Sequence, residues 1–466
     1  MRAYHKYALL SALLLAMVLP SVSYATNGYF LIGFGTKSRA MGGTGVAYNM
    51  DGMAAGFNPA TMIDSDNEFD IGAELFNPPR AIQHDSTTLG QTDEESLKNY
   101  FVIPSMGMTY KYSDDITLGF AFIGAGLQTS YNQTGLSSTC QAVNASNPGS
   151  CPPTVFNANL AGDGPGGEAG VELMQAQMLP SIAYKIDETH TIGATLAIGI
   201  QYFRAEGLSD FIELGYTNEV QGKGDNGVTD EGWDYSFGAG IRLGYLGKFM
   251  DGDLNFGVNY SSRVYMSEFE RYNNLFAEQG DFDIPENFAI GFAYKGINDV
   301  VIAFDIQHIK YSDVAAIGNP GPLASDPSQF YPLCPVGSDL TQCQTGGDLG
   351  LGFGWTDQTI YKLGADWKYN DKFNFRAGLN YAESPIPEDQ VLFNMLAPAT
   401  PELHATIGMS WVYNDTYEFS MNYMHAFLNT IKGPTVFGPG GAIVEGSNAS
   451  IAMEQNSLGF GLAINF

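Results

Sequence analysis

The chain has 466 residues and a formal net charge of -29, from 50 Asp and Glu against 21 Lys and Arg. So acidic a balance argues against nucleic acid as a partner, because phosphate contacts need clustered Lys and Arg. Charged residues make up only 15% of the chain, aromatic residues reach 13%, and the mean hydropathy is -0.08. A chain that is aromatic-rich and charge-poor without being hydrophobic is typical of strands with one apolar and one polar face.

The first 25 residues carry the features of a secretory signal peptide. Arg2 and Lys6 precede an apolar run from Ala8 to Leu19. A small-x-small cleavage site, Ser23-Tyr24-Ala25, follows the run. A membrane anchor helix is the alternative, but the run falls short of the roughly 20 residues that a spanning helix needs. We predict residues 1–25 to be a cleaved signal and leave them out of the fold.

The next segment, residues 26–66, has no strand alternation and contains eight glycines. Its central stretch is Arg39-Ala40-Met41-Gly42-Gly43-Thr44-Gly45, and it ends with Asn58-Pro59-Ala60 and a few further residues. We interpret this segment as a compact insert that plugs the structure formed by the rest of the chain.

Strict alternation of apolar and small or polar residues recurs after Asp66. In one strand, Ile192 to Tyr202 places isoleucine, alanine, leucine and tyrosine at every second position. The pattern predicts about fourteen strands, an even number as in bacterial barrels, near residues 68–77, 101–112, 115–125, 174–186, 190–204, 233–247, 252–263, 284–296, 298–310, 357–370, 372–383, 402–414, 416–428 and 454–466. No apolar run after Leu19 is long enough for a spanning helix, so a membrane location would require a closed barrel.

The connections alternate between short turns and long loops. Short ones carry turn residues, for example Ser113-Asp114 and Asp371. Long ones cover 78–100, 126–173, 205–232, 264–283, 311–356, 384–401 and 429–453. Short periplasmic turns and long outer loops are typical of outer-membrane barrels. A soluble β-sandwich or propeller has no reason for its short and long connections to alternate along the chain. We therefore predict an all-β transmembrane barrel of about 14 antiparallel strands over residues 67–466.

The last strand keeps its apolar face up to the terminal residue, Phe466. An aromatic C-terminal residue on such a strand is typical of proteins inserted by the outer-membrane assembly machinery. We expect that machinery, outer-membrane lipid and lipopolysaccharide as partners, and a monomer in the membrane.

Four cysteines fall into two close pairs, each inside one predicted long loop. An exported protein lies where disulfides persist, so we predict Cys140–Cys151 and Cys334–Cys343. A metal site is a weak alternative, because neither pair has a neighbouring His or CxxC spacing. Acidic runs such as Asp230-Glu231 lack the regular ligand loop of a calcium site, so a solvated surface is preferred. No cofactor or metal is expected.

The chain resembles the FadL/TodX (OMPP1) family of outer-membrane channels for long-chain fatty acids and other hydrophobic compounds. The resemblance rests on Arg39-Ala40 with Gly43 and Gly45, Asn58-Pro59-Ala60, Gly126-Leu127 with Thr129, Tyr202 with Arg204 and Ala205, Pro285-Glu286, Ser384-Pro385 with Pro387, and Tyr423-Met424-His425. It implies a fourteen-strand barrel whose lumen is closed by an N-terminal hatch, residues 26–66, with Arg39, Asn58, Pro59 and Ala60 in hatch and gating roles. It also implies an inward bend of the third strand, at Gly124 and Gly126, which opens a gap in the wall.

The resemblance implies passive uptake of long-chain fatty acids, with ligand-triggered hatch movement and sideways release through the gap. Arg204 is the first candidate for a carboxylate clamp, since its planar fork suits a carboxylate; pairing with Glu206 is the alternative. The hatch residues Tyr29 and Phe30 would lie against the ligand pocket. Apolar loop residues would catch the ligand, namely Leu208, Phe211, Leu275 and Phe276. A second basic group of the family's pocket falls near Thr356, where this chain has no lysine, and the nearby Lys362 does not align.

Two other functions stay open, and a third is not expected. The missing lysine leaves room for uncharged substrates, alkanes or monoaromatic hydrocarbons, by the same route. A non-selective porin or adhesin would lack a working plug. A hydrolase is not expected, because the sequence has no G-x-S-x-G or H-E-x-x-H and its histidines are scattered.

Overall fold

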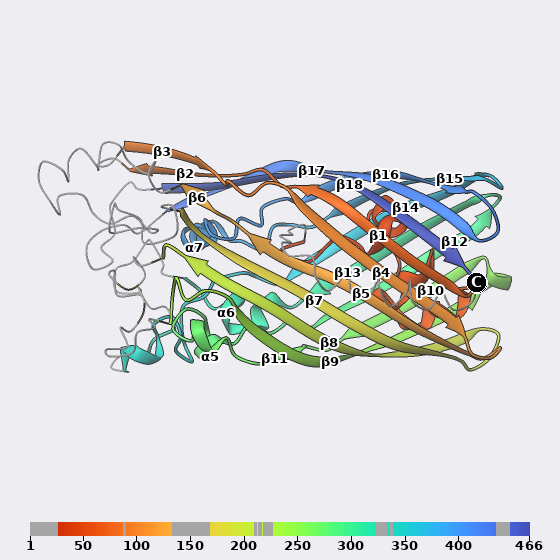
Figure 1. Cartoon of the computed structure of the whole chain (residues 1–466), viewed down its shortest axis with the longest axis horizontal. Helices are drawn as coiled ribbons and strands as arrows, with labels where there is room; N and C mark the ends of the chain where they lie inside the picture. Colours follow the sequence, from red (N-terminus) through yellow and green to blue (C-terminus); the bar gives the residue numbers. More distant parts are fainter. Residues whose placement is uncertain are drawn as a thin grey trace, which may run out of the picture.

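The computed structural model describes residues 27–86, 90–132, 168–208, 212, 217, 227–321, 333–335, 339–434 and 448–466. Fourteen antiparallel strands form a closed barrel (Figure 1). In order around the ring they are β1 (Glu68–Asn77), β4 (Phe101–Lys111), β5 (Ile116–Gln128), β7 (Glu168–Lys185), β8 (His190–Glu206), β9 (Asp234–Phe249), β10 (Leu254–Ser261), β12 (Asn287–Ile297), β13 (Val300–Ile309), β14 (Gln358–Asn370), β15 (Phe373–Tyr381), β16 (Leu403–Val412), β17 (Tyr417–Pro434) and β18 (Asn448–Asn465). The ring closes because β1 pairs with both β18 and β4.

Each predicted strand overlaps one of these, so the predicted fold class is confirmed. The long connections were predicted less well, since they hold four further short strands: β2 (Arg80–Ser86), β3 (Gly90–Glu95), β6 (Tyr131–Asn132) and β11 (Tyr265–Met266). β2 and β3 extend the sheet beyond β18. Their sequences have no continuous apolar face, so alternation could not reveal them.

The two faces of the wall differ as the alternation requires. In β8, Leu196 is 49% exposed on the outer face while Thr195, on the inner face, is 4% exposed. The outer surface is thus a band of aliphatic and aromatic side chains, and small or polar side chains face the lumen. Within the described part of the chain, no helix is long and apolar enough to cross a membrane.

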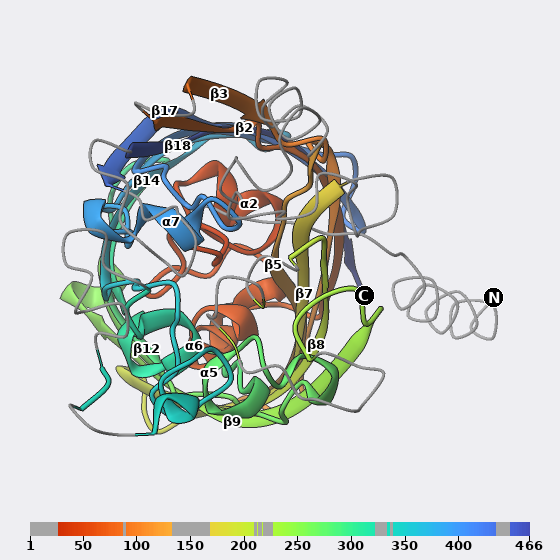
Figure 2. The same cartoon turned by 90° about the vertical axis from the view of Figure 1, so that its left-hand side faces the viewer.

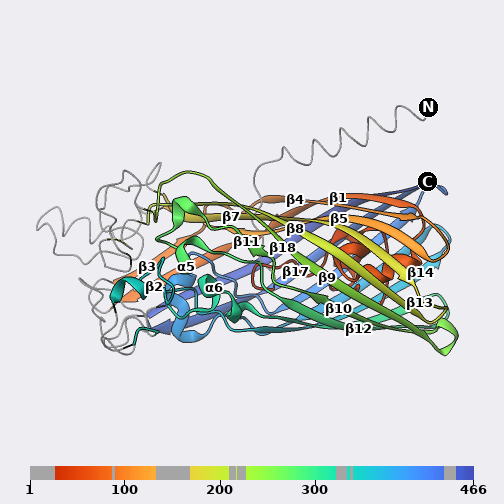
Figure 3. The ribbon, with the colours of Figure 1, turned by 90° about the horizontal axis from the view of Figure 1, so that it is seen from below.

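The N-terminal segment lies inside the ring of strands (Figure 2). It contains α2 (Gly35–Ala40), η1 (Gly52–Gly56) and η2 (Pro59–Asp64). α2 packs against β15 to β18, η1 against β4 and β5, and η2 against β7, β8 and β9. Figures 1 and 3 show these elements in the half of the barrel that is nearer the short turns.

The long connections cover the other end of the barrel. They carry η4 (Glu270–Tyr272), α5 (Ala277–Gly280), η5 (Tyr311–Asp313), α6 (Ala315–Gly318), η7 (Leu340–Gln342), η8 (Glu388–Gln390) and α7 (Val391–Asn394). The one short connection with a helical turn holds η3 (Met250–Gly252). The predicted disulfide Cys334–Cys343 is present, whereas Cys140 and Cys151 lie outside the described residues.

Candidate functional site

The wall of the barrel is interrupted between β4 and β5. β5 pairs with β4 only as far as Met106 opposite Phe122. On its other side it stays paired with β7 up to Gln128 opposite Glu172. The result is a break in the hydrogen-bonded ladder between residues 101–105 and residues 123–128, which we call the wall gap.

Two sequence features account for the wall gap. A Cβ at Gly126 would lie 2.3 Å from the carbonyl oxygen of Leu173, so glycine is needed where β5 closes onto β7. On the opposite edge, Pro104 of β4 has no N–H to donate to a neighbouring strand. Gly124 and Gly126, where an inward bend was predicted, both lie in the part of β5 that is no longer paired with β4. Pro104 was missed, although a proline inside a strand is a readable signal.

An apolar cavity lies at the long-loop end of the barrel and comprises about 560 Å³ of space not filled by atoms, including the solvent space at its mouth. β5, β7 and β8 contribute Leu127, Leu173 and Phe203, and the connections contribute Phe276 and Phe282. Thr345 has the one polar side chain among the described lining residues. Leu208, Leu275 and Phe276, predicted to catch a ligand, all line this cavity, and Phe211 lies outside the described residues.

A row of aromatic rings leads from the apolar cavity to the N-terminal segment. Ring centroids lie 4.7 Å apart for Phe203 and Phe276, and 4.9 Å apart for Phe276 and Phe282. Phe282 is in turn 6.2 Å from Tyr29. Tyr29 is packed against Tyr311 and also contacts Phe30. Tyr29 and Phe30 thus border the apolar cavity through Phe282 and do not line it themselves.

Polar contacts tie residues 27–34 to a long connection and to the wall. The phenol of Tyr311 donates to the carbonyl oxygen of Asn27 at 2.5 Å, and the Lys362 ammonium donates to that of Ile32 at 2.9 Å. Among the described residues, the side chain of Asn27 and the phenol oxygen of Tyr29 are buried without a hydrogen-bond partner. Burial raises the pKa of Tyr29 well above its usual value, so the phenol stays neutral. Unpaired buried polar groups cost free energy, so these two side chains make the observed position of residues 27–34 less favourable.

A second cavity, of about 330 Å³, lies on the inner side of the wall gap and is called the gap cavity. β4 and β5 line it with Ile103 and Ile123, and the N-terminal segment contributes Leu31 and Phe34. Ile123 precedes Leu127 of the apolar cavity by four residues on β5, or roughly 13 Å along a strand. Residues 27–34 therefore run from the rings beside the apolar cavity to the gap cavity.

The remainder of the N-terminal segment is fixed to the wall by buried ion pairs. The Lys37 ammonium lies 3.1 Å from a carboxylate oxygen of Glu418 and 3.5 Å from one of Glu68. The Arg39 guanidinium lies 2.7 Å from the Glu74 carboxylate. All of these side chains are less than one-fifth exposed, so removing one partner would leave an uncompensated buried charge.

The Asn58-Pro59-Ala60 stretch is anchored on the opposite side of the lumen. Asn58 donates from Nδ2 to the carbonyl oxygens of Val46 and Tyr245, at 2.7 and 2.9 Å, and its Oδ1 accepts from the backbone of Ala60. Gly193 of β8, which pairs with a glycine of β9, faces this stretch from the wall. A Cβ at Gly193 would lie 2.5 Å from the Ala60 nitrogen. Asn58 thus joins the segment to the wall through contacts that only a glycine-lined wall allows.

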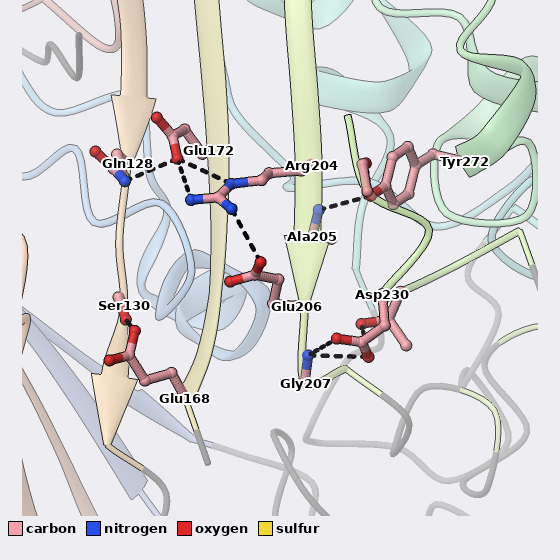
Figure 4. Close-up of polar contacts among 12 residues, drawn as sticks. Gln128, Ser130, Glu168, Glu172, Arg204, Ala205, Glu206, Gly207, Asp230 and Tyr272 are labelled. Atoms are coloured by element: carbon pink, nitrogen blue, oxygen red, sulfur yellow. Dashed lines mark hydrogen bonds and ion pairs between the residues drawn. The ribbon is translucent and has the colours of Figure 1, made fainter. Parts of the chain in front are cut away.

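Arg204 does not line the apolar cavity. Its guanidinium donates to Glu172 at 2.9 and 3.1 Å and to Glu206 at 3.0 Å (Figure 4). Neighbouring residues on a strand point to opposite faces, and Phe203 points into the cavity while Tyr202 is 37% exposed. Arg204 therefore lies on the outer face. There it pairs with Glu206, which was the alternative to a carboxylate clamp. Lys362, in contrast, is in the lumen.

The described residues contain no cluster of three or more His, Cys, Asp or Glu side chains placed to hold a metal ion.

Comparison with known proteins agrees with this architecture. A crystal structure of the Pseudomonas putida toluene transporter TodX superposes with a TM-score of 0.63 at 16% identity, covering 94% of this chain and 99% of that one. The Ralstonia pickettii toluene transporter TbuX gives 0.58 at 17% identity, over 94% and 99%. A FadL homologue of Pseudomonas aeruginosa gives 0.61 at 12% identity, over 94% and 100%. At these identities the likeness shows the shared fold.

Sequence comparison identifies the family. An uncharacterized protein from the 5′ region of the phosphoenolpyruvate carboxykinase gene of Chlorobium limicola is 36% identical over 86 residues, which are 18% of this chain and 42% of that protein. The profile described as outer membrane protein transport protein (OMPP1/FadL/TodX) matches residues 152–466. The chain belongs to this family of transport proteins of the bacterial outer membrane.

Proposed function

We propose that the protein is a passive channel for uncharged hydrophobic compounds, alkanes or monoaromatic hydrocarbons. The observation that carries the proposal is the apolar cavity, in which no charged side chain is found among the described lining residues. Burying alkyl or aryl surface there is favourable by roughly 25 cal/mol per Å². A water-filled porin lumen would offer no such gain.

The same cavity argues against a carboxylate as the preferred ligand. A buried carboxylate without a cation is strongly disfavoured. Arg204, the expected clamp, is engaged by Glu172 and Glu206 on the outer face. Long-chain fatty acids, which the resemblance to the family favours, therefore have less support from this site. The printed names of TodX and TbuX, both toluene transporters, fit the uncharged class.

Residues 27–34 supply the gate of this channel. A ligand in the apolar cavity meets the ring of Phe282 and, behind it, Tyr29. Displacement of this stretch joins the apolar cavity to the gap cavity, and the wall gap then leads sideways into the bilayer. The route needs only a concentration gradient, with the short turns on the periplasmic side. Residues 35–64, with their buried ion pairs and hydrogen bonds, act as the fixed part of the hatch.

The test is uptake of radiolabelled dodecane and dodecanoate by cells that lack other channels of this family. Leu173→Asp puts a carboxylate on the wall of the apolar cavity and should abolish dodecane uptake, whereas the volume-conserving Leu173→Met should keep it. Barrel assembly is checked by heat-modifiable gel mobility. Dodecanoate uptake faster than dodecane uptake, or dodecane uptake unchanged by Leu173→Asp, would contradict the proposal.

A further inference from the structure

The gap cavity differs in chemistry from the apolar cavity. Leu31, Phe34, Ile103 and Ile123 make it apolar on the side toward the wall gap. Its opposite side carries hydrogen-bonding groups, among them the side chain of Asn422 on β17. A plain hydrocarbon has no use for such groups, so their presence on the exit route requires an explanation.

Asn422 is an uncharged lining group with unused hydrogen-bonding capacity. Its residue is 1% exposed, and among the described residues neither Nδ2 nor Oδ1 has a hydrogen-bond partner. An amide buried in this way costs roughly 1–3 kcal/mol per unsatisfied group. The alternation of β17 points it inward, since Met421 and Tyr423 on either side are exposed on the outer face. The amide therefore offers both a donor, Nδ2, and an acceptor, Oδ1, to a molecule in the gap cavity.

The charges beside Asn422 decide which kind of polar head can lie there. Arg39 and Glu74 also line the gap cavity, and they form a mutual ion pair at 2.7 Å. The positive charge of Arg39 is therefore already balanced, and a ligand carboxylate would meet the negative charge of Glu74 without a free cation of its own. An uncharged head avoids that repulsion and can both donate to Oδ1 and accept from Nδ2 of Asn422.

We propose that the gap cavity is a second ligand site, which takes the uncharged hydrogen-bonding head of an otherwise apolar molecule: an alcohol, a phenol or a protonated carboxylic acid. The apolar body then lies between Phe34, Ile103 and Ile123, next to the bilayer. This inference rests on the proposed function and adds neutral amphiphiles to its uncharged substrates; their polar heads pause at Asn422 on the way out.

The test compares 1-dodecanol with dodecane, which share an alkyl chain and differ by one hydroxyl. In cells that carry the full-length protein and no other channel of the family, Asn422→Leu should lower the uptake of 1-dodecanol about two- to tenfold, the range supplied by one net hydrogen bond. Dodecane uptake should be unchanged or faster. Asn259→Leu is the matched control, because Asn259 is also buried with an unpartnered Oδ1 but lines neither cavity.

A second variant covers the case that Asn422→Leu does not assemble. A Cβ at Gly459 would lie 2.2 Å from Oδ1 of Asn422, so Gly459→Ala displaces the same amide from the neighbouring strand. It should lower 1-dodecanol uptake selectively. If either assembled variant slows the alcohol and the alkane alike, or neither, the second site is refuted. If wild-type cells take up dodecane no faster than cells without the channel, the proposed function itself fails, whatever the Asn422 variants do.

Discussion

The phenol of Tyr311 donates a hydrogen bond to the main-chain carbonyl of Asn27, a residue 284 positions earlier in the chain. Tyr311 lies in a long connection at the long-loop end of the barrel. Asn27 is the first described residue of the N-terminal segment. The bond therefore ties residues 27–34, the proposed gate, to one of the connections at the end of the barrel where the apolar cavity lies. Loss or gain of polar contacts at this end should change how readily the gate opens.

Two conservative variants of the gate should act in opposite directions. Tyr311→Phe removes the hydrogen bond to Asn27, worth roughly 0.5–1.5 kcal/mol, and should raise the initial rate of dodecane uptake. Tyr29→Phe removes a buried hydroxyl that has no partner among the described residues, which should stabilise the closed gate and lower the rate. Initial rates are measured at low dodecane concentration, normalised to the amount of folded barrel. Changes in the same direction would show that the two hydroxyls do not control one equilibrium.

The fixed part of the hatch should be sensitive to loss of its buried charges. Lys37→Met leaves Glu68 and Glu418 without their common cation and should cost roughly 3–5 kcal/mol. Lys111→Met is the matched control, because its pair with Asp66 is exposed and should contribute less than about 1 kcal/mol. Urea-induced unfolding of the protein in detergent micelles measures both. Equal losses of stability in the two variants would contradict a stabilising role of the Lys37 ion pairs.

The N-terminal segment should also decide whether the barrel conducts ions. The described part of residues 26–66 packs against β1, β4, β5, β7 to β9 and β15 to β18. Its backbone is also hydrogen-bonded to Asn255 of β10, Asp305 of β13 and Lys362 of β14. The intact protein should therefore be closed to ions in planar bilayers. Deleting residues 26–66 should give a permanently conducting pore with the same barrel. An intact protein that already conducts freely would support the non-selective porin considered above.

One loop next to the apolar cavity should respond to pH. Burial, followed by the negative charge of Asp283, raises the pKa of Asp281 from 3.8 to about 7. The folded loop therefore holds a proton that the unfolded chain has already lost, so its stability is greatest below about pH 4 and falls as pH rises through 7. Hydrogen exchange of residues 266–286, corrected for the intrinsic rate, should show less protection at pH 8.5 than at pH 5.

Asp281→Asn provides the control for this pH effect. The amide is uncharged throughout, so the variant should keep the same protection at both pH values. Phe276 and Phe282 belong to the same stretch and line the apolar cavity. A wild-type loop whose protection does not depend on pH would mean that Asp281 is charged in the folded protein at pH 5.

The sequence predicted the strands well and the site only in part, and Arg204 shows why. Residues Ile192 to Tyr202 at even positions form the apolar outer face of β8. Arg204 continues that even series, so strand parity alone would have placed it outside. Resemblance to the family pointed to the lumen instead, and the geometry follows parity. The contact with Glu172, on the neighbouring strand β7, needed the register as well.

Other features are only partly encoded in the local sequence. The apolar cavity is built partly from connections, in which Leu275 and Phe276 follow no period and only the folded chain shows what they face. The wall gap forms because β5 stays paired with β7 where its pairing with β4 has ended. The close approach of Gly126 to Leu173 of β7 favours this pairing, and it is visible only in the folded chain. Asn422 is polar and inward-facing like many barrel residues, and only its missing partners single it out.

The most direct test of sideways delivery is to close the wall gap. Continuing the β4–β5 register by one residue beyond Met106 and Phe122 would set Ser105 opposite Ile123, and both residues line the gap cavity. In the double variant Ser105→Cys, Ile123→Cys, a short bifunctional thiol reagent should reduce dodecane uptake to the level of cells without the channel. Each single cysteine variant, treated in the same way, should keep its uptake. Undiminished uptake by the crosslinked protein would contradict exit through the wall.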